Sequence, residues 1–317
     1  MNKVFIAGGA GFIGSHLTKH FLTQPDTQVT VFDNFSSGQD RHLEDVINNT
    51  SLKIIRADLK DLNTLTTALT GHDCVFLFAS NPDIAKAMTQ PDIDFWEGTY
   101  LTQNMIEAMR VNQIKKIIYA SGSGIYGDTG YQEVSENYAP LLPISTYGAS
   151  KLAGEALICS YCHMFNIIGR VYRFANVVGP NQTHGVAYDF IRKLKKDPNH
   201  LSIMGDGTQS KSYIYVDDII EAILLSDKLS NEQFDFFNVA TDDYITVKEI
   251  AYIVVEEMGL KNVDFQFSGG DRGWKGDVPV VRFNLEKIHS MGWRSKFNSQ
   301  KAIRQSVRAM LTANFNY

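Results

Sequence analysis

The sequence predicts an α/β protein in which a doubly wound parallel sheet is joined to a smaller, discontinuous α+β domain. Two observations predict this. In the first 120 residues, short apolar runs alternate with longer segments of helical periodicity, and parallel strands need such crossover helices. After about residue 177 the pattern changes to helices separated by loops rich in Gly, Asp and Asn, which indicates a second domain assembled from separate stretches.

Each expected strand is a short run rich in β-branched or aromatic residues. The strands are expected at Val4–Ala7, Val29–Asp33, Lys53–Ala57, Val75–Phe78, Lys116–Ala120, Ile168–Phe174 and Phe234–Ala240. Apolar residues at helical spacing predict helices at Phe12–Thr23, Leu62–Thr70, Thr99–Val111 and Thr146–Met164. The first domain is therefore expected to span residues 1–176 plus about 211–243, and the second about 177–210 plus 244–317.

The composition narrows the class of protein. The chain has 317 residues, of which 44% are hydrophobic and 21% charged, so it can bury a core and is not a disordered protein. Its net charge of −5 argues against a general nucleic-acid binder, because long-range attraction to phosphate needs a basic balance. Three cysteines are too few for disulfides to stabilise a chain of this size, which indicates a reducing compartment. No apolar run is long enough for a signal peptide or a membrane span. We expect a cytoplasmic protein with no membrane partner.

No bound metal or haem is expected. Cys159-x-x-Cys162-His163 matches a haem-attachment motif, but it lies within an expected helix and no export signal precedes it. No second pair of ligands stands at zinc spacing from these cysteines.

A glycine-rich turn directly follows the first strand. Gly8, Gly11 and Gly14 fit the pattern GxxGxxG, and Gly9, Gly11 and Gly14 fit GxGxxG. Between a strand and a helix, such glycines allow a tight turn, close approach of a pyrophosphate to backbone N–H groups, and close packing of helix on strand. The motif alone is also compatible with a plain turn, but the strand–turn–helix context favours a Rossmann dinucleotide site.

Two acidic residues follow later strands. Asp33 ends the second strand, 19 residues beyond Gly14. A carboxylate at this place accepts both hydroxyls of an adenosine ribose and repels a 2′-phosphate, so NAD is favoured over NADP. The alternative for Asp33 is an ordinary strand-end or helix-capping role. Asp58 ends the third strand and is a candidate for the adenine side, with capping as the alternative.

Tyr147 and Lys151 form a Tyr-x-x-x-Lys pair. On a helix, residues four apart lie on one face. An ammonium beside a phenol stabilises the phenolate, so the tyrosine can act as a general base. The pair follows the serine-rich turn at residues 121–127, at the carboxyl edge of the expected sheet where such folds bind ligands.

A second match to the same motif, Tyr244-x-x-x-Lys248, is interpreted as accidental. Thr246 and Glu249 predict a capping box, which places Tyr244 before the helix start and off the face that carries Lys248.

At these motifs the chain resembles the extended short-chain dehydrogenases, and within them the NAD-dependent nucleotide-sugar epimerases and dehydratases. The resemblance covers essentially the whole chain. The matching segments occur in the family's order: Gly8/Gly11/Gly14, Asp33-Asn34, the turn before Tyr126-Gly127, Tyr147/Lys151, Arg173–Pro180 and Gly205–Gln209. Trp274–Pro279 and Met291-Gly292-Trp293 most resemble the UDP-hexose 4-epimerases.

The resemblance implies a redox-neutral reaction on a UDP-sugar. NAD would take the hydride from the sugar C4 and return it to the opposite face of a 4-keto sugar, with Tyr147 as base and acid. Lys151 would hold the nicotinamide ribose and lower the tyrosine pKa. The resemblance also implies a homodimer formed through the helices at 99–111 and 146–164. The alternatives are a 4,6-dehydratase, a decarboxylase, a C4 dehydrogenase, or a non-catalytic NAD-binding sensor or scaffold protein.

The resemblance also assigns site residues. The implied cofactor contacts are Gly8, Gly11, Phe12, Ile13, Gly14, Asp33, Asn34, Asp58, Leu59, Ala79, Tyr147 and Lys151. The implied substrate contacts are Ser123, Asn176, Lys211, Trp274 and Asp277.

The chain departs from the family around the serine-rich turn. Family epimerases usually have Ser or Thr where this chain has Gly122. Either Ser123 or Ser121 would then hydrogen-bond the C4 oxygen, or Tyr147 would work unaided. Family dehydratases carry Asp and Glu where this chain has Ser123 and Gly124. The elimination of water would lack its acid and base, which disfavours the dehydratase alternative.

A further departure affects phosphate binding. Lys211 and Trp274 stand where the family usually has arginine. Lysine supplies charge without the bidentate fork of arginine, and Arg272 and Arg282 are the candidates to compensate.

Overall fold

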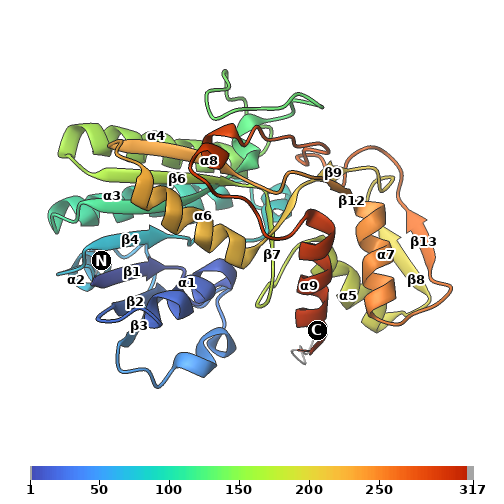
Figure 1. Ribbon diagram of the computed structural model, residues 1–317, viewed down its shortest axis with the longest axis horizontal. Helices are drawn as coiled ribbons and strands as arrows, with labels where there is room; N and C mark the ends of the chain where they lie inside the picture. The colour runs from blue at the N-terminus through green and yellow to red at the C-terminus, as the bar shows by residue number, and fades with distance from the viewer. Residues whose placement is uncertain (1, 313–317) are drawn as a thin grey trace. The chain divides into compact units, whose positions relative to one another are not determined.

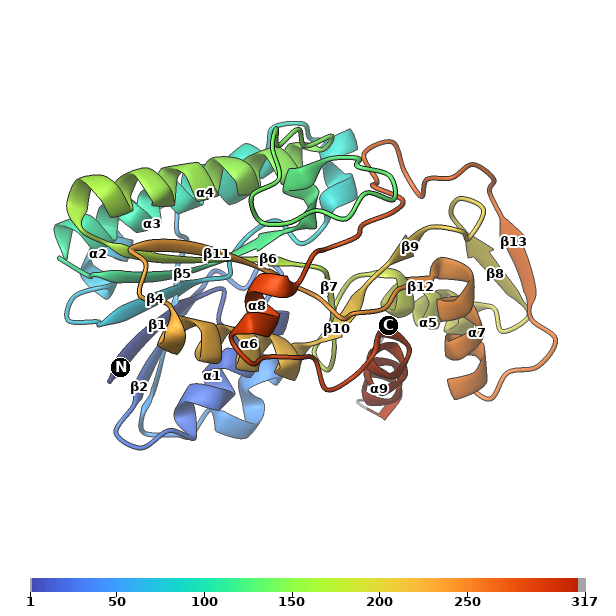
Figure 2. The same cartoon turned by 45° about the horizontal axis from the view of Figure 1, so that its top comes forward.

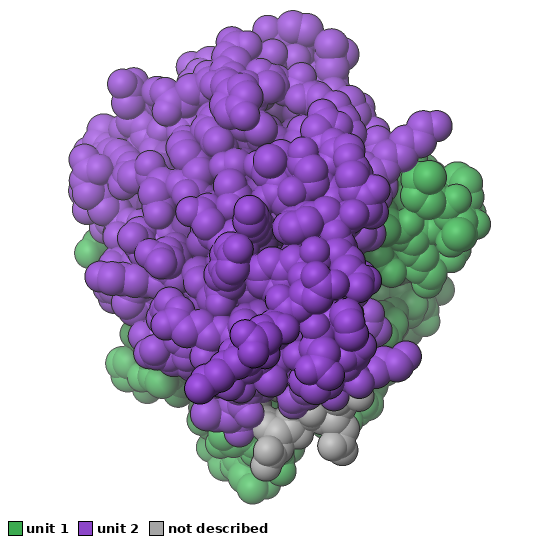
Figure 3. Space-filling view, turned by 90° about the vertical axis from the view of Figure 1, so that its right-hand side faces the viewer, with its two compact units in different colours: residues 1–125, 146–173, 227–237 green, residues 126–145, 174–226, 238–317 purple. Residues whose placement is uncertain are grey.

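A computed structural model describes residues 2–312 of the chain. The chain forms two compact units, coloured separately in Figure 3. Unit 1 contains Met1–Ile125, Thr146–Arg173 and Asp227–Phe237, and unit 2 contains Tyr126–Ser145, Phe174–Ser226 and Asn238–Tyr317.

The unit boundaries differ from the expected domains because residues 126–145, 174–176, 211–226 and 238–243 belong to unit 2. For the first segment the reason lies in its hydrogen bonds. Tyr126 donates its hydroxyl to Asn238 Oδ1 over 2.7 Å, and the Val134 N–H donates to the Arg282 carbonyl over 2.9 Å. Such long-range pairings are invisible to local periodicity.

Unit 1 is built on a seven-stranded sheet with the order β11-β6-β5-β4-β1-β2-β3 (Figure 1). Its strands are β1 (Lys3–Ala7), β2 (Gln28–Asp33), β3 (Leu52–Arg56), β4 (Cys74–Leu77), β5 (Lys116–Gly122), β6 (Ile168–Phe174) and β11 (Phe234–Val239). All seven predicted strands are confirmed to within two residues. β1 pairs in parallel with β2 on one side and β4 on the other, so the strand order reverses there. The predicted doubly wound sheet is confirmed, and such sheets bind ligands at this reversal point.

Helices cover both faces of this sheet (Figures 1 and 2). α1 (Phe12–Leu22) lies on one face, and α2 (Leu62–Ala68), α3 (Tyr100–Val111) and α4 (Thr146–Phe165) lie on the other. The four predicted helices are thus confirmed. The second face is closed by a continuous apolar core that includes Phe5, Val75, Ile117, Met105 and Ile158. This packing fixes α4, and with it Tyr147 and Lys151, against the sheet.

Short helical turns connect these elements in unit 1. They are η1 (Asp40–Val46), η2 (Ile84–Met88), the π-helical turn η3 (Phe95–Thr99) and η4 (Ser123–Tyr126), whose last residue lies in unit 2.

Unit 2 combines helices with three two-stranded sheets. Its helices are α5 (Val186–Lys196), α6 (Val216–Leu229, whose last three residues lie in unit 1), α7 (Val247–Glu257), α8 (Glu286–Ser290) and α9 (Ser299–Thr312). The sheets pair β7 (Asn176–Val178) with β10 (Tyr213–Tyr215), β8 (His200–Ile203) with β13 (Asp264–Phe267), and β9 (Ser210–Lys211) with β12 (Ile245–Thr246). α5, α7 and α9 bury Ile191, Ile250 and Ile303 in one core.

Within residues 2–312, no helix has the length and apolar character needed to cross a membrane.

Candidate active site

The glycine-rich turn has the geometry of a phosphate site. Gly8 has φ +80°, and a Cβ there would lie 2.7 Å from the Ala79 nitrogen. A Cβ on Gly14 would lie 2.0 Å from the Gly8 carbonyl oxygen. Gly11 caps α1 without a side-chain hydrogen bond, and the first turn of α1 carries no acidic residue. The first N–H groups of α1 are therefore left for an anion, which fits the pyrophosphate of a dinucleotide.

Asp33 lies beside this turn. Its carboxylate accepts hydrogen bonds from the Ala10 N–H over 2.9 Å and from the Phe35 N–H over 2.8 Å. Burial raises the pKa of Asp33, although both hydrogen bonds favour its ionised form. A carboxylate can accept about four hydrogen bonds, so two acceptor positions remain for ribose hydroxyls.

Asn34 and Asp58 form the adjoining part of the predicted cofactor site. The Asn34 side chain donates to Asp58 Oδ2 over 3.1 Å, and Asp58 Oδ1 accepts the Lys60 N–H over 2.8 Å. Asp58 thus closes a local turn, which supports the structural alternative for this residue. Leu59 is buried and Ala79 partly buried.

Lys151 is buried beside Tyr147. Its ammonium donates to the Ala120 carbonyl over 2.8 Å, and its nitrogen lies 5.5 Å from the centre of the Tyr147 ring and 5.2 Å from that of Tyr119. Only 3% of the Lys151 surface is exposed. An ammonium has three donors, and the carbonyl uses one, so the others fit the hydroxyls of a nicotinamide ribose.

Burial sets the proton affinities of this pair. It raises the pKa of Tyr147 to about 12, and a hydrogen bond with Ser80 opposes that rise. It lowers the pKa of Lys151 to about 8, against the opposing charges of Asp94 and Glu155. The expected depression of the tyrosine pKa by Lys151 is therefore not found in the protein alone, where burial raises this pKa. Sequence reasoning did not identify Ser80 or Asp94, although Ser80 directly follows the predicted cofactor contact Ala79.

The two candidate serines have different environments. Ser121 is 5% exposed and donates its hydroxyl to Glu155 Oε1 over 2.5 Å, and Glu155 is paired with Arg173 at 2.8 Å. This buried network engages Ser121, which argues against its predicted role at the sugar C4 oxygen. Ser123 is partly exposed and begins η4. A Cβ on the next residue, Gly124, would lie 3.4 Å from the Gly148 Cα, so this turn lies against α4.

In unit 2 the predicted substrate residues lie close together. The Lys211 ammonium is 2.7 Å from Asp277 Oδ1, and the Asp277 N–H donates to the Trp274 carbonyl over 3.0 Å. The Asn176 side chain donates to the carbonyl of Ser212, the residue after Lys211, over 3.4 Å. Lys211, Asp277 and Trp274 thus form one cluster, and Asn176 bonds to the backbone of the residue that follows Lys211.

The two arginines proposed to compensate differ. Arg272 donates to the Asp277 carbonyl over 2.7 Å and also pairs with Asp128, so it borders the cluster. Arg282 donates to the Ser210 carbonyl over 2.9 Å and stacks on Tyr244, 3.7 Å from its ring centre. These contacts give Arg282 a structural role, which disfavours it as a phosphate ligand.

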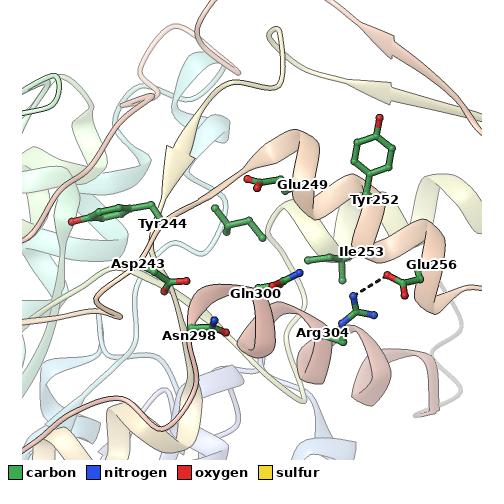
Figure 4. Close-up of a pocket in the computed structure, with 10 residues that line it drawn as sticks. Asp243, Tyr244, Glu249, Tyr252, Ile253, Glu256, Asn298, Gln300 and Arg304 are labelled. Atoms are coloured by element: carbon green, nitrogen blue, oxygen red, sulfur yellow. Dashed lines mark hydrogen bonds and ion pairs between the residues drawn. The ribbon is translucent and has the colours of Figure 1, made fainter.

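The accidental Tyr-x-x-x-Lys motif is also explained. Thr246 and Glu249 form the predicted capping box at the start of α7, and Tyr244 precedes it. Tyr244 lines a shallow pocket of about 290 Å³ that also includes Glu249, Tyr252 and Arg304 (Figure 4). None of the predicted site residues lines this pocket.

A doubly wound sheet with a glycine-rich turn, an acidic residue after β2 and a Tyr–Lys pair on one helix defines a dinucleotide-dependent enzyme of the extended short-chain dehydrogenase class. A sequence profile of the NAD dependent epimerase/dehydratase family matches residues 4–240. The chain belongs to this family, as the motifs predicted, and NAD is its cofactor.

Related proteins span both reaction types of the family. A putative UDP-glucose 4-epimerase from Methanocaldococcus jannaschii is 29% identical, over 98% of this chain and 99% of the relative. A dTDP-D-glucose 4,6-dehydratase from Mus musculus is 27% identical, over 96% of this chain and 87% of the relative.

Solved structures resemble the whole chain. A UDP-galactose 4-epimerase crystal structure has a TM-score of 0.88 and 34% identity, covering 99% of this chain and 100% of its own. The UDP-glucose 4-epimerase of Thermus thermophilus, solved with NAD, has a TM-score of 0.87 and 28% identity, covering 98% of this chain and 99% of its own.

Proposed function

We propose that the protein is a UDP-sugar 4-epimerase that interconverts UDP-glucose and UDP-galactose. The observation that carries this proposal is the Tyr147–Lys151 pair on one face of α4, beside a turn with no carboxylate at Ser123 or Gly124. Tyr147 alone can remove and return one proton at C4, whereas elimination of water would also need an acid and a base at the positions of Ser123 and Gly124. The names of the relatives support the same substrate class.

Each side chain has a distinct role in the proposed reaction. Bound NAD would supply the chemistry of hydride removal and return at C4. Tyr147 accepts the proton of the C4 hydroxyl and returns it after the 4-keto sugar has rotated to present its opposite face. Because burial holds the pKa of Tyr147 near 12, its phenolate needs a neighbouring cation, and Lys151 is the one that this chain supplies.

Each unit supplies its own candidates for substrate contacts. The Ser123 hydroxyl donates to the C4 oxygen in the place that Gly122 leaves empty. Lys211 is the candidate to hold the diphosphate, with its position fixed by Asp277. On this proposal unit 1 binds NAD and unit 2 binds the nucleotide sugar.

The test is incubation of the purified protein with UDP-glucose, UDP-galactose and their N-acetyl analogues, followed by NMR of the sugar. An inverted C4 with unchanged mass is the expected result. Loss of water, best sought with dTDP-glucose, would identify a dehydratase instead. A keto sugar with accumulating NADH would identify a dehydrogenase, and loss of carbon dioxide from a UDP-uronic acid a decarboxylase. No change in any sugar would favour a non-catalytic NAD-binding protein.

We also propose a homodimer formed through α3 and α4. Among the described residues, each helix exposes one large apolar side chain, Val111 on α3 (54% exposed) and Met164 on α4 (70% exposed). Sedimentation equilibrium tests this, and a monomer at micromolar concentration would contradict it.

A further inference from the structure

One buried carboxylate near the Tyr147–Lys151 pair has no part in the proposed reaction. Asp94 is 1% exposed and directly precedes η3, but its side chain does not cap that segment. Its carboxylate accepts a hydrogen bond from Asn81 Nδ2 over 2.9 Å and one from Thr146 Oγ1 over 2.6 Å. Burying a carboxylate is costly unless it is hydrogen-bonded and paired with a cation, and the hydrogen-bond donors of Asp94 are both neutral.

Thr146 links Asp94 to the start of α4. It is the first residue of this helix and directly precedes Tyr147. A second contact fixes the same helix turn: a Cβ on Gly98, within η3, would lie 2.7 Å from Ser150 Oγ, and Ser150 in turn donates to the Tyr147 carbonyl over 2.9 Å. Asp94, directly before η3, and Gly98, within η3, therefore lie against α4 at Thr146 and Ser150, on either side of Tyr147. π-helical turns such as η3 occur frequently at functional sites.

Asn81 holds the other side of the Asp94 carboxylate. Its amide oxygen accepts the Asp83 N–H over 3.0 Å, and its amide nitrogen also donates to the Asp83 carbonyl over 2.9 Å. Asn81 is 5% exposed and fixed by these bonds. The carboxylate of Asp94 is thus held by hydrogen bonds from the Asn81 amide on one side and from Thr146, the first residue of α4, on the other.

The hydrogen bonds of Asp94 bring no positive charge to its carboxylate. Both donors are neutral, and among residues 2–312 no lysine or arginine forms an ion pair with this carboxylate. The other anion that acts on Lys151 is Glu155, which Arg173 neutralises at 2.8 Å. The charge of Asp94 raises the pKa of Lys151 and of Tyr147, so it favours the ammonium and opposes the phenolate.

We propose that Asp94 is a positioning residue for the Tyr147–Lys151 pair: it anchors the first turn of α4 through Thr146 and supplies the buried negative charge that keeps Lys151 an ammonium. The charged and titratable groups around Lys151 are Asp94 before η3, Glu155 and Tyr147 on α4, and Tyr119 on β5. Only the kinetic part of the test rests on the proposed function.

The first experiment needs no substrate. The protein is labelled with ¹³C at lysine Cε, and the signal of Lys151 is assigned by its loss in Lys151→Arg. In Asp94→Asn, which removes the charge and keeps the shape, the titration midpoint of Lys151 should fall by about one pH unit. Asp92→Asn is the matched control, because Asp92 is exposed in the same loop and bonds Trp96. Equal midpoints in the wild type and Asp94→Asn overturn the proposal.

The second experiment separates anchoring from charge. Thr146→Val removes the hydroxyl bonded to Asp94 and leaves the charge, so kcat should fall about tenfold with KM and the Lys151 midpoint unchanged, as expected for loss of one positioning hydrogen bond. Thr146→Ser should restore kcat. In Asp94→Asn, both limbs of the pH profile of kcat should move to lower pH.

Unchanged kcat in Thr146→Val would overturn the anchoring role. Thermal unfolding checks that each variant is folded, and Asp94→Ser replaces Asp94→Asn if the amide variant does not fold. A shifted Lys151 midpoint in a protein that converts no UDP-sugar would leave this inference standing and reject the proposed function alone.

Discussion

The Lys151 ammonium lies 5.5 Å from the centre of the Tyr147 ring while it donates to the Ala120 carbonyl at the end of β5. One buried cation thus connects the sheet edge to the general-base candidate. Its remaining donors are what a bound ribose would use.

Tyr147→Phe should lower kcat by about 10²–10⁴-fold, which is the usual contribution of a general acid–base group. The ring is kept, so binding of NAD, measured by quenching of protein fluorescence, should stay within a few-fold of wild type. Tyr244→Phe is the control, because Tyr244 belongs to the accidental motif and stacks on Arg282 through its ring. Equal activity of both variants would reject Tyr147 as the base.

Ser121→Ala and Ser123→Ala should affect different properties. Ser121 donates to Glu155 in a buried ion-pair network, so its loss should reduce the free energy of unfolding by about 1–3 kcal/mol. Ser123→Ala should instead lower kcat and leave stability within about 0.5 kcal/mol of wild type. Urea unfolding and initial-rate kinetics on both variants make the comparison, and the reverse pattern would exchange the two assignments.

Gly8→Ala should abolish NAD binding or folding, whereas Gly71→Ala should be tolerated. Both glycines have φ near +80°, so both variants carry a similar backbone strain of about 1–2 kcal/mol. Only at Gly8 does the added Cβ meet the backbone of Ala79, because nothing lies within 4 Å of the corresponding position at Gly71. Melting temperatures and NAD titrations compare the two variants. Similar losses of stability and NAD affinity in both would show that backbone strain, and not the close approach of Ala79, causes the effect at Gly8.

Lys151→Met should stabilise the protein relative to wild type at pH 7, and less so at higher pH. Burial lowers the pKa of Lys151 from 10.5 in the unfolded chain to about 8. Between these values the unfolded chain binds more protons, so the contribution of Lys151 to stability rises with pH across this window. The advantage of the variant should shrink by about 2–3 kcal/mol between pH 8 and 10. A difference in unfolding free energy that does not change with pH would contradict the buried ammonium.

Lys211→Ala should raise the KM for UDP-sugars more than it lowers kcat, because a phosphate contact far from C4 contributes equally to ground-state and transition-state binding. Lys211→Arg should retain most of the affinity, since arginine can bind both Asp277 and a diphosphate. A fall in kcat with unchanged KM would place Lys211 outside the substrate site.

The sequence predicted those features that depend on neighbours along the chain. The strands of unit 1 are apolar runs bounded by helices, and the glycine turn and the Tyr147–Lys151 pair follow from spacing alone. Asp94 was missed because its partner Thr146 is 52 positions away and nothing in the local pattern marks it. Ser121 was kept as a catalytic candidate because its partner Glu155, 34 positions on, was equally hidden.

Unit 2 was harder to predict for the same reason. β8 pairs with β13, so His200–Ile203 needs Asp264–Phe267 to form a sheet at all. Strands this short have no periodicity of their own, and their pairing is decided by the core that α5, α7 and α9 bury.

Because unit 2 is assembled from segments far apart in the sequence, the two units should fold at different times during synthesis on the ribosome. Tyr213 donates its backbone N–H to Ser299 Oγ over 3.0 Å, and Ile303, Val307 and Met310 of α9 complete the core of unit 2. The nascent chain cannot close that core until residue 310 has emerged, whereas all strands of unit 1 are available once residue 239 has been made. Unit 1, which carries the glycine-rich turn, should therefore fold during synthesis before unit 2 is complete.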